Sequence, residues 1–206
     1  MAAIYQTAYP RIKSNLSQDE LGDIYTLTTE DQKFALRHCK RASISFLGLL
    51  IQLKTTQRLG RFSSLKEIPK AIITHIKNQC LSRATLKELQ AYFASGAKGR
   101  HVKLIRRYIR IKPFDKVKTS KLVKIWALEA AMTKEMLPDI INVTLEYLVK
   151  ERYELPGFST LERLCQAART EVNTQTLFFF PEACLSRKSE SIYRSVVAPT
   201  MLINLA

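Results

Sequence analysis

Basic side chains gather in the middle of the sequence, at a density that could bind phosphate. Residues 98–124 hold eleven Lys and Arg side chains against one acid, Asp115. Like charges about one helical turn apart repel each other by roughly 0.2–0.5 kcal/mol per pair. A phosphate backbone would relieve this repulsion and would release counterions. The candidate phosphate-binding residues of this segment are Lys98, Arg100, Lys103, Arg106, Arg107, Arg110, Lys112, Lys116, Lys118, Lys121 and Lys124.

A second basic segment, residues 32–66, holds eight Lys and Arg side chains and no acid. Its candidate phosphate contacts are Lys54, Arg58 and Arg61. Because part of this segment flanks an apolar helix, its basic side chains could instead lie along that surface with only their charged ends in water. Residues 125–178 hold five basic and eight acidic side chains, so the net charge of +15 comes from the two basic segments. This charge favours a polyanionic partner such as nucleic acid, although a solvated basic surface is the simpler alternative.

No group of residues has the spacing of a catalytic or metal-binding motif. The sequence has no Gly-rich phosphate loop, no H-E-x-x-H pair and no G-x-S-x-G turn. The four cysteines are far apart and the three histidines share no ligand spacing with them, so we expect reduced thiols and no zinc site or other cofactor. The acids are expected to be solvated helix residues, namely Glu129, Glu135, Asp139, Glu146 and Glu162.

The apolar pattern predicts helices nearly throughout, because no stretch keeps the alternation of a half-buried strand. Capping boxes are predicted for Ser17 with Glu20, for Thr29 with Gln32 and for Ser159 with Glu162. Residues 43–60 are apolar on almost every side and predict a buried central helix that Gly60 ends. Of the other predicted helices, a short one begins at the Ser17 capping box, one lies within 64–81, and the rest cover about 29–40, 84–94, 99–110, 119–134, 138–151 and 159–173.

The two glycines within residues 94–101 mark the best internal boundary. We therefore expect an all-α protein made of two small helical bundles, at residues 14–95 and 98–175, followed by a linker or atypical tail at 176–206. A turn at Leu155–Phe158 between two predicted helices makes a helix-turn-helix-like element. Its connection is longer than the three or four residues of the usual DNA-binding motif, so periodicity alone leaves its role open.

The segment LPGFSTLERLCQAAR at 155–169 resembles part of the N-terminal domain of the large replicative transposases of the Tn-three family. Other stretches resemble the same domain in the same order: LSQDELGDIYTLTTEDQKF, FLGLLIQLKTTQRLGRF, EIP and RHVKLIRRYIRIKPF, the last an Arg/His-led basic helix that adds His101 to the candidates. The resemblance covers roughly residues 14–173. After Asn173 the sequence departs from the family's continuing helix.

The resemblance implies a region that binds double-stranded DNA at the terminal inverted repeats of a transposon. In such transposases the metal-binding acids that cut and join DNA lie several hundred residues further on, so we expect no enzymatic activity from this chain alone. Thr160, Arg163 and Gln166, near the start of the last predicted helix, are the candidate base-reading residues.

We also expect a cytoplasmic, nucleoid-associated bacterial protein with no membrane or small-molecule partner, which could self-associate through other regions of a full-length protein. The longest apolar run, residues 44–53, is about half of the roughly 20 residues that a membrane span needs. Two other classes remain open: a non-specific nucleic-acid-binding module, and a helical adaptor for an acidic protein partner.

Overall fold

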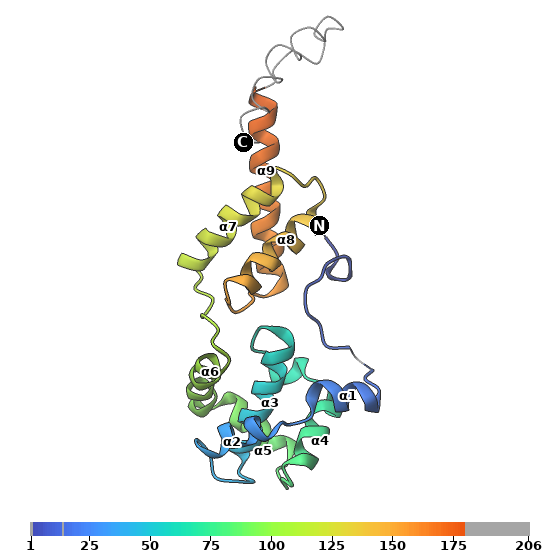
Figure 1. The fold of residues 1–206 in the computed structure, drawn as a ribbon, viewed down its shortest axis with the longest axis vertical. Helices are drawn as coiled ribbons and strands as arrows, with labels where there is room; N and C mark the ends of the chain where they lie inside the picture. The colour runs from blue at the N-terminus through green and yellow to red at the C-terminus, as the bar shows by residue number, and fades with distance from the viewer. Residues whose placement is uncertain (1, 14, 180–206) are drawn as a thin grey trace, which may run out of the picture.

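The computed structural model describes residues 2–13 and 15–179 (Figure 1). All regular elements in these ranges are helical, which confirms the predicted all-α class. Two 3₁₀ turns, η1 (Ile4–Gln6) and η2 (Leu65–Glu67), accompany the α-helices. The α-helices are α1 (Gln18–Tyr25), α2 (Thr29–Leu36), α3 (Ile44–Leu59), α4 (Lys70–Gln79), α5 (Leu86–Ala94), α6 (Gly96–Ile109), α7 (Lys118–Ala131), α8 (Leu137–Lys150) and α9 (Phe158–Phe179).

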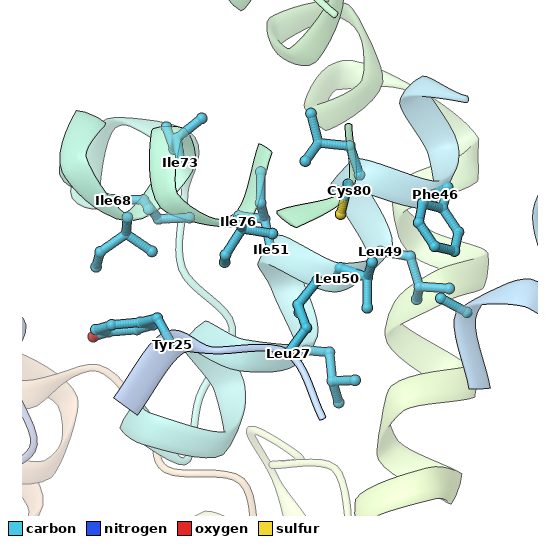
Figure 2. Close-up of a cluster of buried hydrophobic side chains, with 14 of the residues drawn as sticks. Tyr25, Leu27, Phe46, Leu49, Leu50, Ile51, Ile68, Ile73, Ile76 and Cys80 are labelled. Atoms are coloured by element: carbon cyan, nitrogen blue, oxygen red, sulfur yellow. The ribbon is translucent and has the colours of Figure 1, made fainter. Parts of the chain in front are cut away.

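Helix α3 forms the centre of the first hydrophobic cluster, as the sequence predicts. Every residue from Phe46 to Thr56 is buried, and α1, α2, α4, α5 and α6 pack around the helix. Figure 2 shows side chains of this core from α3 and α4, with Ile76 of α4 beside Ile51 of α3. Gly48 lets α5 approach closely, because a methyl group there would overlap the Tyr92 ring. The helix ends at Gly60, which has a φ of 65°, a conformation that glycine adopts without strain.

Of the three predicted capping boxes, one lies where it was predicted, one lies one residue earlier, and the third is excluded as a cap because Ser159 lies inside its helix. The box of Ser17 and Glu20 is present at α1. At α2 the cap is Thr28, whose hydroxyl accepts from the Asp31 amide at 3.1 Å, so the box lies one residue before the predicted one. Helix α9 begins at Phe158, where the carbonyl of Gly157 accepts the first helical hydrogen bonds. Glu162 is bonded to the Ala2 amide instead, at 2.8 Å.

The second hydrophobic cluster is built by α7, α8 and α9, which pack against one another. Ala2 and Tyr9 belong to it although they come from the N-terminal end of the described chain. The Tyr9 hydroxyl donates to the Pro156 carbonyl at 2.6 Å, and its ring meets Phe158 edge to face. The N-terminal segment thus lies on the second cluster before it runs to α1 in the first (Figure 1).

Helix α6 packs in the first cluster, whereas the sequence predicts it in the second unit. Its fully buried residue Ile105 lies in the core around α3. The glycines that suggested a boundary are helical instead: Gly96 opens α6, and only Ser95 separates it from α5. The chain passes to the second cluster after α6, through residues 110–117.

The C-terminal helix is longer than predicted. Helix α9 continues to Phe179, so residues 176–179 are helical rather than part of the expected linker. Residues 180–206 of the expected tail lie outside the described residues. Residues 151–157 connect α8 to α9, and α9 packs on both α7 and α8.

Candidate nucleic-acid interface

The outer side of α6 carries the densest exposed positive charge. Its buried stripe includes Ile105, and the half-buried Val102 and Ile109 lie on the same side, as the periodicity predicts. Tyr108 is 37% exposed but stacks on the Phe34 ring at 4.1 Å. Because these side chains fix the rotation of the helix, the basic residues between them face outward. The exposed ones are Arg100, Lys103, Arg107 and Arg110.

Exposed lysines continue from the end of α6 into the start of α7. Arg110 ends α6 in the left-handed conformation, with a φ of 56°. The Asp115 carboxylate then accepts hydrogen bonds from the amides of Val117 and Lys118 at 2.8 and 2.6 Å, which lowers its pKa. Asp115, the acid of this segment, therefore binds backbone amides at the start of α7. The exposed lysines here that make no ion pair within residues 2–13 and 15–179 are Lys116, Lys118 and Lys121, whereas the exposed Lys112 pairs with Glu151.

A hollow of about 420 Å³ lies where the two clusters meet. Arg61 comes to it from the end of α3, Lys116 from before α7 and Arg163 from the first turns of α9. We call this feature the junction hollow. The free amides and the dipole of a helix N-terminus favour anions, and the start of α9 lies in its wall. The other lining residues are Phe62, Phe114, Ser120, Glu154, Leu155, Pro156, Gly157 and Thr160.

Hydrogen bonds between the clusters surround this hollow. Arg106 of α6 donates through Nε and Nη2 to one carboxylate oxygen of Glu154, at 3.0 and 2.6 Å, and its guanidinium lies over the Phe62 ring. The Leu155 amide donates to the Gly60 carbonyl at 2.8 Å. Lys112 pairs through its backbone with Arg152 and Glu154. These bonds fix the position of the cationic residues of α6 relative to the N-terminus of α9.

Several predicted phosphate contacts are engaged inside the protein. Lys54 is 8% exposed, and its ammonium lies 3.3 Å from the buried carboxylate of Asp31. It faces the core, so it is not placed to meet an external phosphate. Four other candidates have acidic partners at or near the surface: Arg61 with Glu67, Arg106 with Glu154, Lys112 with Glu151 and Lys124 with Glu171. Lys98 is half-buried and lies over the Phe93 ring.

His101 is an interior residue rather than a surface contact. The Tyr92 hydroxyl accepts from Gln52 Nε2 at 2.5 Å and lies 2.7 Å from His101 Nδ1, while Nε2 of the histidine lies 3.6 Å from Cys39 Sγ. Burial, and then the nearby Arg100 and His38, lower the pKa of His101. A neutral imidazole in this network is unsuited to an external phosphate.

The remaining basic candidates are exposed, and none makes an ion pair within residues 2–13 and 15–179. We call them the exposed cation set: Arg58, Arg100, Lys103, Arg107, Arg110, Lys116, Lys118, Lys121 and Arg163. Of the candidate base-reading residues, Gln166 and Arg163 are exposed on α9, and Thr160 is half-buried in the wall of the junction hollow.

Arg58 lies apart from the rest of this set, and it faces residues that the sequence analysis missed. It lines a second hollow, of about 650 Å³, together with Arg11 and Lys13 of the N-terminal segment. Both side chains are exposed, but Lys13 pairs with Glu20, whereas Arg11 makes no ion pair within the described ranges. No periodic pattern could find Arg11, because it lies outside any helix and reaches Arg58 only through the course of the folded chain.

A family model described as a domain of unknown function, DUF4158, matches residues 1–168. The chain belongs to the DUF4158 family. This family is found in transposase-associated proteins. No curated protein matches the chain.

The DUF4158 match extends over both hydrophobic clusters and over the junction between them. It includes the start of α9 with Thr160, Arg163 and Gln166, and it ends at Ala168.

Three further features of the DUF4158 chain bear on its chemistry. Within the described ranges, no three His, Cys, Asp or Glu side chains are grouped so that they could hold a metal ion. The same ranges contain no helix with the length and apolar character of a membrane span. Cys80 and Cys165 are free and buried, and burial raises the pKa of each thiol to about 11, so both are protonated at neutral pH.

Proposed function

We propose that this chain binds double-stranded DNA, as the N-terminal DNA-binding region of a transposase that recognises transposon ends. The observation that carries the proposal is the exposed cation set, which lies, apart from Arg58, on α6, around the start of α7 and on α9, and which makes no ion pair among the described residues. The chain also belongs to a family that is found in transposase-associated proteins, and this membership supports the same proposal.

The positions of these residues support two different roles in DNA binding, namely phosphate contact and base contact. Lys103, Arg107 and Arg110 are exposed along the last turns of α6, where they can meet successive phosphates of a duplex. Such contacts supply affinity and orientation but little sequence information. Arg163 and Gln166 lie on the exposed side of the first turns of α9, and we propose that these two residues contact base edges.

The junction between the clusters supports binding by both units at once. The pair of Arg106 and Glu154 and the bond between Leu155 and Gly60 fix α6 relative to α9. A duplex that contacts both helices would therefore require little further ordering of the protein.

A titration with two duplexes tests this proposal. One duplex carries the inverted-repeat end of a transposon that encodes the chain, and the other is a scrambled duplex of the same length and composition. Each is titrated by fluorescence anisotropy at about 50 and 200 mM salt, a range over which six or more phosphate contacts weaken binding by on the order of 10³-fold. We expect both duplexes to show this salt dependence, with the transposon end bound at least about tenfold more tightly.

A Thr160→Ala/Arg163→Ala/Gln166→Ala variant tests the base-reading part. It should bring the two affinities together and leave the scrambled duplex bound almost as before, apart from one lost cation. Equal affinity of the parent chain for both duplexes would indicate a non-specific module. No binding of either duplex at moderate salt would contradict the proposal as a whole.

A further inference from the structure

An apolar groove with a basic rim lies on the first cluster between α4 and α5. It consists of two adjoining hollows, of about 670 and 250 Å³, which share Lys70, Ile73 and Leu86 in their walls. Other apolar lining comes from Leu65, Ile68, Pro69 and Phe93 in the larger hollow and from Leu47 and Leu89 in the smaller. Leu86 is 48% exposed, so a large apolar side chain is open to solvent at the point that the two hollows share.

The rim of this groove carries lysines and no acid. Lys66, Lys70 and Lys98 line the larger hollow, and Lys77 lines the smaller one. None of these lysines has an ion-pair partner in the described part of the chain.

The neighbouring acids are already engaged elsewhere. Glu67 pairs with Arg61 at 2.7 Å. Glu88 accepts hydrogen bonds from the backbone amide and the hydroxyl of Thr85 at 2.7 and 2.8 Å, and so caps α5. The lysines of the rim therefore make no ion pair with these acids, and Lys77 alone is attracted to Glu88 from a distance, which contributes to the lowered pKa of that carboxyl.

We propose that this groove binds an acidic amphipathic helix of a partner protein. The apolar floor suits leucine-type side chains repeated every three or four residues, and the lysines suit Glu or Asp on the flanks of such a helix. Helix α4, of ten residues, is roughly 15 Å long, which corresponds to about three turns of a bound helix. A DNA backbone has no apolar face that would fill the floor, so this groove serves a different partner from the exposed cation set.

The binding probe is a synthetic 18-residue helical peptide with Leu at positions of one face and Glu on both flanks. Fluorescence anisotropy of the labelled peptide measures its affinity for the full chain. A scrambled peptide of the same composition has no apolar face and controls for attraction by charge alone. We expect saturable binding of the amphipathic peptide and at least about tenfold weaker binding of the scrambled one.

Two matched substitutions separate the groove from the rest of the surface. Leu86→Gln removes the exposed anchor, and Leu36→Gln changes a leucine that is 45% exposed at the end of α2, away from the groove. Leu86→Gln should weaken peptide binding at least about tenfold, whereas Leu36→Gln should leave it unchanged. Both variants should keep the parent melting temperature to within a few degrees and the parent affinity for duplex DNA.

A charge reversal tests the rim. The Lys66→Glu/Lys70→Glu variant should lose affinity for the acidic peptide and gain affinity for a version in which Lys replaces Glu. The proposal is overturned if the amphipathic peptide does not saturate, if the scrambled peptide binds equally well, or if Leu86→Gln has no effect. It is also overturned if anionic lipid vesicles, and not the peptide, show the dependence on Leu86. Because DNA binding is measured separately, these outcomes do not bear on the proposed function.

Discussion

Arg106 of α6 donates two hydrogen bonds to a single carboxylate oxygen of Glu154, and this contact joins the two hydrophobic clusters across 48 residues of sequence. The arginine also lies over the Phe62 ring, 5.4 Å from its centroid. The pair is only partly exposed, at 28% and 14% of the two side chains, so water screens it less than a pair on the open surface. Arg106, which sequence reasoning assigned to a phosphate, therefore has a structural role.

A double-mutant cycle measures this contact. Arg106→Ala and Glu154→Ala should each lower the free energy of unfolding by about 1–3 kcal/mol, since each leaves a half-buried partner without its bond. The double variant should lose less than the sum, with a coupling of about 0.5–2 kcal/mol in denaturant unfolding. Arg107→Ala, the exposed neighbour, should change stability by less than about 0.5 kcal/mol. Additive losses would contradict the assigned contact.

Two glycines should respond oppositely to alanine. Gly60 has a φ of 65°, and a methyl group there would lie 3.1 Å from Leu155 across the junction, so Gly60→Ala should destabilise the protein by about 1 kcal/mol or more. Gly99 lies inside α6 with open space around it, so Gly99→Ala should stabilise by about 0.5–1 kcal/mol. Thermal unfolding of both variants is the measurement, and a stabilising Gly60→Ala would exclude the described turn.

Removal of the Lys54 side chain should affect stability rather than DNA affinity. Lys54→Ala leaves the Asp31 carboxylate, which is 2% exposed, without its cationic partner, although Gln57 still lies 3.4 Å from it. We expect a loss of about 2–4 kcal/mol in unfolding free energy. The salt dependence of duplex binding, measured below the melting transition, should match that of the parent chain. A weaker salt dependence of duplex binding in this variant would indicate that Lys54 does contact a phosphate.

The pH dependence of stability should reveal the buried imidazole of His101. Burial lowers its folded-state pKa below the ordinary value of 6.5, so the unfolded chain binds the proton more readily than the folded one. The contribution of the neutral form is therefore complete above about pH 6.5 and is lost as the pH falls below that value toward the folded pKa. Denaturant unfolding between pH 5 and 8 should show a loss on acidification that is smaller in His101→Gln. Identical profiles would contradict a neutral, buried His101.

The helices could be predicted from the sequence because local signals decide them. The apolar run around Leu50 gave the buried helix α3, and Gly60 gave its end. The α2 cap was misplaced by one residue because Thr28 and Thr29 are both suitable caps, and the choice depends on which side chain, Asp31 or Gln32, reaches back.

The site was only partly predictable, because its residues meet through tertiary contacts. A charge count cannot tell Lys54, which faces Asp31 in the core, from the exposed Arg58 one turn later. The pattern around Ile105 predicts the buried side of α6, yet the cluster that this side joins depends on α3, which lies about 50 residues away in sequence. The junction hollow unites Arg61, Lys116 and Arg163, and no spacing in the sequence links these three residues.

The salt dependence of duplex binding by two matched triple variants tests the central claim most directly. Lys103→Ala/Arg107→Ala/Arg110→Ala removes three members of the exposed cation set, and Lys134→Ala/Lys150→Ala/Arg152→Ala removes three exposed cations elsewhere. Both triplets lower the net charge equally, and each includes one arginine with a φ of 56°. We predict that the first variant alone loses up to about 0.9 per missing contact from the slope of log K against log salt concentration. Equal slopes for the two variants would contradict the placement of DNA on α6.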